Sequence, residues 1–215
     1  MQQKHHYTHL IWDFNGTVLN DVRLGMDSVN TMLARRNLPI LADEDAYRHK
    51  FGFPIEDYYR RLGFDFEKED YHTVLAPEWV ALYRAGEADC PLNDGVTETI
   101  AAIRARGIPQ IILSASKRTQ LTDQLTHLGL MDSFQEILGL DNIHAKSKTG
   151  LALEWMQRHP DAHPLFVGDT VHDADVARAV GADCILFVGG HQPADLLATC
   201  GKPMISAISE ILKYL

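Results

Sequence analysis

The chain has 215 residues, 46% of them hydrophobic, so it can bury a sizeable core in one domain or in one domain carrying an insertion. It is acidic, with 20 Lys and Arg residues against 29 Asp and Glu residues and a net charge of −9. Basic residues form no run beyond pairs, which argues against a nucleic-acid partner. No apolar stretch approaches the roughly 18 residues of a membrane span, so we expect neither a membrane partner nor secretion. The three widely spaced cysteines favour reduced thiols in a cytoplasmic protein.

The first predicted element is a short apolar strand over residues 9–14. Asp13 is the next-to-last residue of this strand, and Asn15, Gly16 and Thr17 directly follow its last residue, Phe14. A carboxylate at the carboxyl end of a buried parallel strand lies where open α/β sheets bind ligands. It is desolvated enough there to act as a nucleophile or to hold a cation. Asn15 is unexpected, because an amide side chain does not titrate near neutral pH and cannot serve as a general acid or base.

The following stretch, residues 20–90, contains no convincing strand. Its apolar residues recur at helical spacing instead. The predicted helices cover residues 22–37, 43–49, 55–62 and 71–85. We therefore predict a core domain of residues 1–19 and 91–215 and a helical cap domain of residues 20–90 inserted into it. The aromatic residues of the cap are expected to pack with one another rather than to stack on a ligand.

After the insertion, strand-length apolar runs alternate with helical patterns. The predicted strands cover residues 109–114, 136–140, 164–167, 184–188 and 203–206. The predicted helices cover residues 96–106, 118–128, 149–158, 173–180, 194–199 and 208–215. This alternation, with strands that are apolar on both faces, is typical of an α/β fold in which helices cover both sides of a parallel sheet.

Further polar residues stand where predicted strands end or predicted helices begin. They are Ser114 after one strand, Lys148 before a helix with Lys146 as its rival, and Asp169 after another strand with Asp173 four positions on. Together with Asp13 they supply a carboxylate nucleophile, a phosphate-binding hydroxyl, an ammonium group and acidic metal ligands. Phosphoryl transfer needs this set, because its catalysis is mostly positioning and electrostatic stabilisation of charged oxygens.

With these motifs in this order, the chain resembles the haloacid dehalogenase superfamily with a helical (C1-type) cap, in its phosphoglycolate-phosphatase and β-phosphoglucomutase-like branch. The family pattern is a strand with Asp-x-Asp-Gly-Thr, a strand-end Ser or Thr, a Lys, and Gly-Asp-x-x-x-Asp. The chain meets this pattern over essentially its whole length with one departure, Asn15 in place of the second Asp. The resemblance implies a Rossmann-like core, Mg²⁺ as cofactor and a small phosphorylated metabolite as substrate. It implies no particular oligomeric state.

The resemblance also implies roles for individual residues. Asp13 matches the nucleophile that forms an aspartyl-phosphate, Ser114 would hydrogen-bond the transferring phosphate, and Lys148 would neutralise the charges of both. The Mg²⁺ ligands would be Asp13, Asn15 through its backbone carbonyl, Asp169 and Asp173. The remaining expected substrate contacts are Gly16, Thr17, Ala115 and Ser116 beside the strand ends, and Lys50 and Arg60 in the cap.

Three of these residues also have a purely structural explanation. Asp13 could belong to a turn, Ser114 could be a capping hydroxyl, and Asp173 could be the first-turn acid of its helix. His172 lies in the same loop as Asp173. It has no His or Cys partner at metal-ligand spacing, so we expect it to face solvent.

Asn15 leaves several outcomes open. In the family, the second Asp of the first motif protonates the leaving oxygen and then activates water, help that is typically worth about 10²–10⁴ in rate. With Asn15 the chain could be a slow phosphatase, a phosphatase in which His172 or a cap residue replaces the base, or a phospho-ligand-binding protein with little turnover. Phosphotransferase or mutase chemistry is a further alternative, and Asn15 could also deamidate to aspartate before Gly16. We favour a Mg²⁺-dependent phosphatase, because the other groups of the site are retained.

Overall fold

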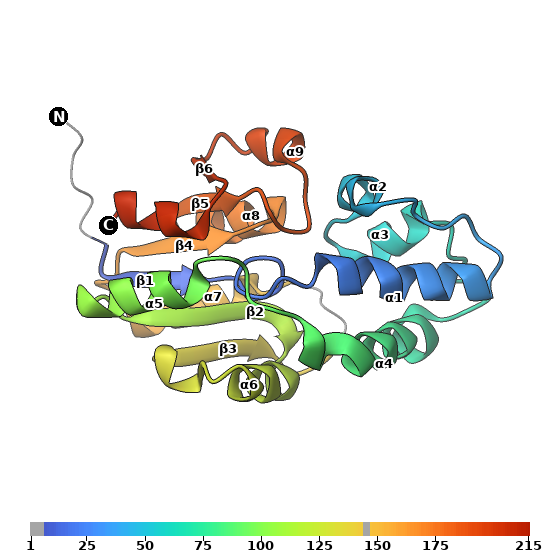
Figure 1. Cartoon of the computed structure of the whole chain (residues 1–215), viewed down its shortest axis with the longest axis horizontal. Coiled ribbons are helices and arrows are strands. Elements are labelled where there is room, and N and C mark those ends of the chain that lie inside the picture. The colour runs from blue at the N-terminus through green and yellow to red at the C-terminus, as the bar shows by residue number, and fades with distance from the viewer. Residues whose placement is uncertain (1–6, 144–146) are drawn as a thin grey trace.

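A computed structural model of the chain describes residues 7–143 and 147–215. Within these ranges, six parallel strands form one sheet in the order β3-β2-β1-β4-β5-β6 (Figure 1). The strands are β1 (His9–Trp12), β2 (Gln110–Lys117), β3 (Glu136–Leu140), β4 (Pro164–Gly168), β5 (Asp183–Phe187) and β6 (Met204–Ile205). The chain leaves β1 toward one edge and returns to β4 on the other side of β1. The point where the strand order reverses, which is where such sheets bind ligands, therefore lies at the carboxyl end of β1.

Helices cover both faces of the sheet, which confirms the predicted α/β class. They are α5 (Val96–Ala105), α6 (Arg118–His127), α7 (Thr149–Arg158), α8 (Val171–Ala179) and α9 (Ala194–Ala198), with 3₁₀ segments at Met131–Ser133 and Ile208–Lys213. Leu10 and Trp12 of β1 pack into the core that contains α5 and α6, whereas Ile11 packs into the core that contains α7 and α8. This burial of both faces explains why the strands are continuous apolar runs.

The residues between β1 and α5 are helical and share a hydrophobic core of their own. The helices are α1 (Val22–Arg35), α2 (Glu44–Lys50), α3 (Ile55–Arg61) and α4 (Ala76–Gly86), with a π-helical turn at Tyr71–Leu75 and a 3₁₀ turn at Glu87–Asp89. They lie beyond the carboxyl ends of the strands, over the reversal point of the sheet (Figure 1). We keep the name cap for residues 20–90.

Two helix starts differ from the prediction by two residues or more. α8 begins at Val171 rather than at Asp173, because the side chain of Thr170 caps the helix by accepting from the backbone N–H of Asp173. The predicted helix over residues 71–85 opens with a π-helical turn. Pro77 near the start of α4 has no N–H to donate to the preceding turn, so that turn cannot be regular α-helix.

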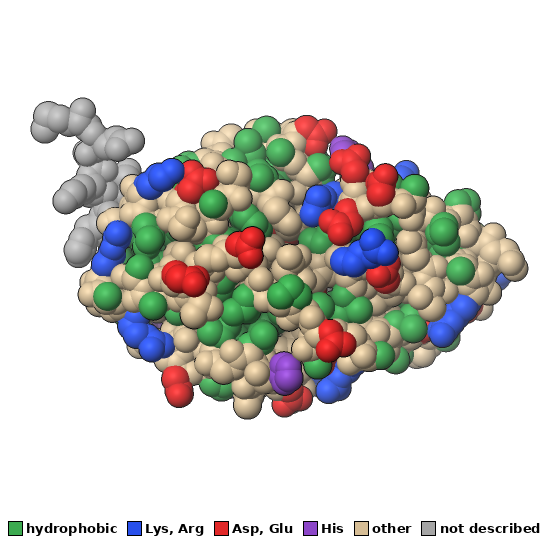
Figure 2. Space-filling view, in the orientation of Figure 1, with side chains coloured by type: hydrophobic (Ala, Val, Ile, Leu, Met, Phe, Trp, Pro, Cys, Tyr) green, Lys and Arg blue, Asp and Glu red, His purple; other side chains and the backbone are tan. Residues whose placement is uncertain are grey.

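The surface carries mixed charge. Figure 2 shows one face of the molecule, on which acidic and basic side chains are interspersed over both the sheet and the cap. That face offers no basic patch of the kind that binds nucleic acid. In the part of the chain that is described, no helix combines the length and the apolar character needed to cross a membrane.

Candidate active site

The turn after β1 places Asp13 at the reversal point of the sheet. The backbone N–H of Asp13 donates to the carbonyl of Val167 in β4 (2.8 Å). Gly16 adopts a φ of +76°, and a Cβ atom there would lie 2.3 Å from Asp169 Oδ2 and 2.6 Å from His191 Cδ2. The motif therefore needs glycine both for the turn and for the close approach of Asp169.

Lys148 is the cation of this site. Its buried side chain forms an ion pair with Asp13 and another with Asp173 Oδ1 (2.6 Å), and it donates to the carbonyl of Leu113 (3.0 Å). Burial lowers the pKa of a lysine, but the two carboxylates raise the pKa of Lys148 above its usual value, so the ammonium stays charged. Lys146, the rival considered from the sequence, lies outside the described residues.

Three carboxylates, those of Asp13, Asp169 and Asp173, offer oxygen atoms that all lie within 4.8 Å of one another. Burial and the neighbouring acids raise the pKa of Asp13 well above its usual value and that of Asp169 to about 6. One lysine therefore does not balance the three carboxylates. A hard divalent cation with oxygen ligands fits this donor set and this charge deficit.

Asp173 combines the two roles considered for it. Its Oδ2 accepts from the backbone N–H groups of Asp169 (3.2 Å) and Thr170 (2.9 Å) and from the Thr170 hydroxyl (2.7 Å), as a first-turn acid of α8 does. Its Oδ1 pairs with Lys148. Burial raises the pKa of a carboxyl, but Lys148 brings the pKa of Asp173 below its usual value. The capping contacts thus fix one oxygen and direct the other toward the acidic cluster.

β2 runs to Lys117, beyond the predicted end at Ser114, and brings two serines beside Asp13. Ser114 Oγ accepts from the backbone N–H of Ser116 (3.0 Å), which leaves the Ser114 hydroxyl proton for a ligand. Ser116 Oγ donates to Asn15 Oδ1 (2.8 Å). One cavity brings together most of the predicted site residues, namely Asp13, Asn15, Ser114, Ala115, Ser116, Lys148, Asp169 and Asp173.

Gly16 and Thr17 support this cavity from the turn after β1. Thr17 is fully buried, and its hydroxyl donates to Asp169 Oδ1 (2.9 Å). The other oxygen of Asp169 accepts from the backbone N–H of His191 (2.6 Å). Both oxygens of Asp169 are therefore held in place by donors.

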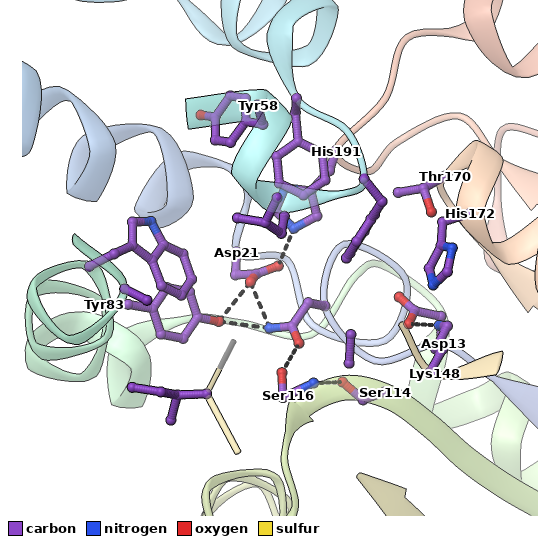
Figure 3. A pocket seen from close by; sticks show the side chains of 18 of the residues that line it. Asp13, Asp21, Tyr58, Tyr83, Ser114, Ser116, Lys148, Thr170, His172 and His191 are labelled. Carbon is purple, nitrogen blue, oxygen red and sulfur yellow. Dashed lines mark hydrogen bonds and ion pairs between the residues drawn. The ribbon is translucent and has the colours of Figure 1, made fainter. Parts of the chain in front are cut away.

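Asn15 is held as an amide by a buried carboxylate, Asp21, to which the sequence assigned no role. Asn15 Nδ2 donates to Asp21 Oδ2 (2.8 Å) and to the hydroxyl oxygen of Tyr83 (2.9 Å). Asp21 is 2% exposed and accepts further from the Tyr83 hydroxyl (2.6 Å) (Figure 3). It also accepts from the backbone N–H of Gly16 (2.7 Å). The side chain at position 15 thus faces two hydrogen-bond acceptors, the Asp21 carboxylate and the Tyr83 hydroxyl oxygen. An ionised carboxylate at position 15 could not donate a hydrogen bond to either of them.

His191 completes this network from the loop after β5. Its Nε2 lies 3.2 Å from Asp21 Oδ1 and its Nδ1 lies 2.9 Å from the hydroxyl of Tyr47 in α2, so the ring joins the core to the cap. Burial lowers the pKa of a histidine, but Asp21 raises that of His191 to about 9. Burial alone would raise the pKa of Asp21, yet the charged ring holds it below its usual value. The one sequence signal for this loop is the pair Gly189-Gly190, which indicates a close approach of the backbone to another group. A Cβ atom on Gly190 would lie 2.2 Å from Asp169 Oδ2.

This buried pair makes the stability of the metal-free protein depend on pH. The pKa of His191 is about 9 in the fold against about 6.5 in the unfolded chain, so its contribution is complete below about pH 6.5 and is lost as the pH rises through about 9. In EDTA, the free energy of unfolding from chemical denaturation should fall on the order of 3 kcal/mol across that window. His191→Gln should flatten this dependence, whereas His163→Gln at an exposed loop position should retain it. An unchanged slope in His191→Gln would contradict the assignment.

Residues 10–187 match the sequence profile of the haloacid dehalogenase-like hydrolases. The chain belongs to this family. The family expected from the motifs and the expected hydrolase are therefore confirmed.

Several relatives are similar to this haloacid dehalogenase-like hydrolase over most of its length. Phosphoglycolate phosphatase of Pseudomonas putida is 25% identical over 190 residues, which are 85% of this chain and 70% of that protein. Tyrosine-protein kinase PtkA of Mycobacterium tuberculosis is 26% identical over 205 residues, which are 94% of this chain and 69% of that protein. A haloacid dehalogenase-like hydrolase of Streptococcus pneumoniae with a solved structure has a TM-score of 0.81 at 18% identity, covering 97% of this chain and 98% of that chain. This likeness confirms the fold.

His172 of this haloacid dehalogenase-like hydrolase does not face solvent, as the sequence led us to expect. Its ring stacks on Phe53 of the cap, with 4.6 Å between the centroids and 28° between the planes, and it lines the cavity (Figure 3). The expectation was wrong because the cap loop folds over the start of α8. Its Nε2 is buried, and no hydrogen-bond partner for it stands among the described residues. Burial and then Lys148 lower the pKa of His172, so the ring is neutral and can contact a ligand.

The two predicted cap cations lie away from the cavity above Asp13. Arg60 is exposed, pairs with Asp57 (2.8 Å) and covers the ring of Phe66 at 4.6 Å. Lys50 is exposed at the end of α2 and borders a neighbouring hollow, which shares Phe51, Phe53 and His172 with that cavity. Their contact with substrate stays a prediction.

Proposed function

We propose that this haloacid dehalogenase-like hydrolase is a Mg²⁺-dependent phosphatase that cleaves a small phosphate monoester through an aspartyl-phosphate on Asp13. The observation that carries the proposal is the meeting of buried Lys148 with three convergent carboxylates beside the Ser114 hydroxyl. The repulsion among the three buried carboxylates destabilises the empty site. A bound cation relieves this repulsion and, together with Lys148, stabilises the phosphoryl oxygens of a substrate. The phosphoglycolate phosphatases that are similar to the chain support the same reaction class.

In this proposal each residue of the site has a distinct role. Asp13 attacks phosphorus, Lys148 neutralises Asp13 and the phosphoryl oxygens, and Ser114 donates its free hydroxyl proton to the phosphate. Mg²⁺ would be held by Asp13, Asp169, Asp173 and the backbone carbonyl of Asn15, and would supply further charge stabilisation. Gly16 and Thr17 shape the turn, and Ala115 and Ser116 border the phosphate position.

Residues 20–90 act in this proposal as a cap domain that excludes water from the phosphate. Cap closure over a small cavity favours a small phosphorylated metabolite over a protein as substrate. The cysteines Cys90, Cys184 and Cys200 are all free, in keeping with a cytoplasmic location.

Phosphate release from a panel of small esters tests the proposal. Release should require Mg²⁺ and stop in EDTA. Independently of activity, Mg²⁺ at about 100 times its Kd should stabilise the protein by about 2.7 kcal/mol in thermal unfolding, and Asp169→Asn should reduce this effect. If Mg²⁺ supports no phosphate release from any ester and leaves the melting temperature unchanged, the proposal fails.

Phosphoryl transfer to an acceptor other than water is the second candidate. The observation that favours it is the engagement of Asn15 with Asp21 and Tyr83, because no titratable side chain at position 15 activates water. A relative named as a tyrosine-protein kinase agrees with transfer chemistry. Labelled phosphate that persists on Asp13 and moves to an added alcohol would favour transfer. Rapid release to water with no detectable phospho-enzyme would exclude it.

A further inference from the structure

The wall of the cavity that faces Asp13 from the cap is apolar. Every described lining residue between positions 47 and 83 is aromatic or aliphatic, among them Phe51, Phe53, Ile55, Tyr58, Trp79 and Val80. Trp79 is stacked on Tyr83, with 4.7 Å between the ring centroids. The cap thus presents ring faces and aliphatic carbon to whatever is attached to the phosphate.

Three tyrosines of this wall direct their hydroxyls to other partners, whereas the buried hydroxyl of Tyr58 has no hydrogen-bond partner among the described residues. The hydroxyl of Tyr47 lies 2.9 Å from His191 Nδ1, and that of Tyr83 donates to Asp21 (2.6 Å). The hydroxyl of Tyr59 points to the sulfur of Met32 (3.9 Å). Tyr47, Tyr59 and Tyr83 therefore add aromatic surface to the cavity and little hydrogen-bonding capacity.

Apart from Asp21 at the start of the cap, the charged groups that line the cavity lie on the opposite, core side. Lys148 is paired with Asp13 and Asp173, and His191 is paired with Asp21. Lys117 lines the cavity from the end of β2, also on the core side. A phosphate at Asp13 therefore meets charge, whereas a carboxylate on its leaving group would be pressed against rings at a desolvation cost.

The second observation concerns the leaving oxygen. Position 15, where the family places its general acid, holds an amide whose Nδ2 already donates to Asp21 and Tyr83. An alkoxide leaving group would need a proton that Asn15 cannot give. A phenolic hydroxyl ionises near pH 10, so an aryloxide can depart without one.

We propose, on the basis of the function proposed above, that the substrate is an aryl phosphate whose ring lies against the cap wall around Phe53 and Trp79. An oxygen of Asp13 bonds to phosphorus as the bond between phosphorus and the aryl oxygen breaks. The electron pair leaves on the aryloxide, which takes a proton from solvent. Water oxygen then bonds to phosphorus as the bond to Asp13 breaks, its proton passes to solvent, and inorganic phosphate and the Asp13 carboxylate result.

A matched set of four phosphoryl compounds, three esters and one acyl phosphate, tests this inference with the full chain and Mg²⁺. Phenyl phosphate has the ring and the phenolic leaving group, benzyl phosphate has the ring and an alkoxide leaving group, and 2-phosphoglycolate has a carboxylate and no ring. Acetyl phosphate has a good leaving group and no ring. We expect kcat/KM for phenyl phosphate to exceed that for benzyl phosphate by at least about 10-fold and that for 2-phosphoglycolate by at least about 100-fold.

Variants of Trp79 test the ring contact. Trp79→Ala should lower kcat/KM for phenyl phosphate about 10-fold, with a loss at least about 5-fold smaller for acetyl phosphate. Trp79→Phe, which keeps a ring, should retain most of the activity toward phenyl phosphate. Equal losses on both substrates in Trp79→Ala would overturn the ring contact.

The outcomes separate this inference from the proposed function. If 2-phosphoglycolate or benzyl phosphate is cleaved as well as phenyl phosphate, the inference is overturned while the phosphatase stands. If none of the four compounds, acetyl phosphate included, releases phosphate with Mg²⁺, the proposed function itself fails.

Discussion

Asp13→Asn is expected to lower phosphate release about 10³-fold or more and to leave the protein at least as stable as the wild type. Activity falls because the amide is a far poorer nucleophile than the carboxylate. Stability does not fall, because burial and the neighbouring acids raise the pKa of Asp13 well above its usual value. A carboxyl whose pKa is raised in the fold destabilises the metal-free protein when it ionises at neutral pH. Phosphate release with Mg²⁺ and thermal unfolding in EDTA measure the two effects.

The combination of lost activity and retained stability distinguishes a catalytic Asp13 from a turn or capping residue. A capping acid would show the opposite pattern, a drop in melting temperature with activity changed only through folding. Asp123→Asn on α6 is the matched control, because Asp123 is exposed and its ion-pair distance to Arg84 is 3.9 Å. If Asp13→Asn lowers the melting temperature by several degrees in EDTA, Asp13 is a structural residue.

The parts of the site that the sequence predicted are those that depend on local pattern. Asp13, Ser114 and Asp169 follow apolar runs that are buried on both faces, and parallel strands bring their carboxyl ends to the same edge of a sheet. Lys148 stands at the start of an amphipathic helix. Periodicity and strand ends were therefore enough to expect the fold class and this part of the cavity.

The parts that the sequence did not predict depend on how the cap meets the core. Asp21 and His191 are 170 residues apart, and their pairing follows from the loop after β5 reaching the turn after β1. His172 was expected in solvent, because no local pattern reveals that Phe53 of the cap stacks on it. Tertiary contacts between distant segments decide both of these arrangements.

The single substitution Asn15→Asp, which restores the family's second aspartate, is expected to lower stability with little rise in turnover. In Asn15→Asp, a carboxylate oxygen takes the place of Nδ2, which lies 2.8 Å from Asp21 Oδ2. Two acceptors then face each other in a buried network, so the free energy of unfolding should fall by about 1–3 kcal/mol. Turnover of benzyl phosphate should rise little, because a carboxyl that is displaced, or that shares its proton with Asp21, cannot deliver that proton to the leaving oxygen. Chemical denaturation and steady-state kinetics measure the two effects.

The double variant Asn15→Asp/Asp21→Asn is expected to raise turnover, because it exchanges donor and acceptor across the same contact, although it also removes the carboxylate that pairs with His191 and so lowers stability. An amide at position 21 can donate to a carboxylate at position 15, and the Ser116 hydroxyl donates to an oxygen at position 15 in either case. Cleavage of benzyl phosphate, which needs a general acid, should rise by about 10²-fold over the wild type, with a smaller rise for phenyl phosphate. Asp21→Asn alone is the control, since it sets two amides against each other and supplies no acid. If Asn15→Asp alone matches the double variant in turnover of benzyl phosphate, Asp21 does not determine the residue at position 15.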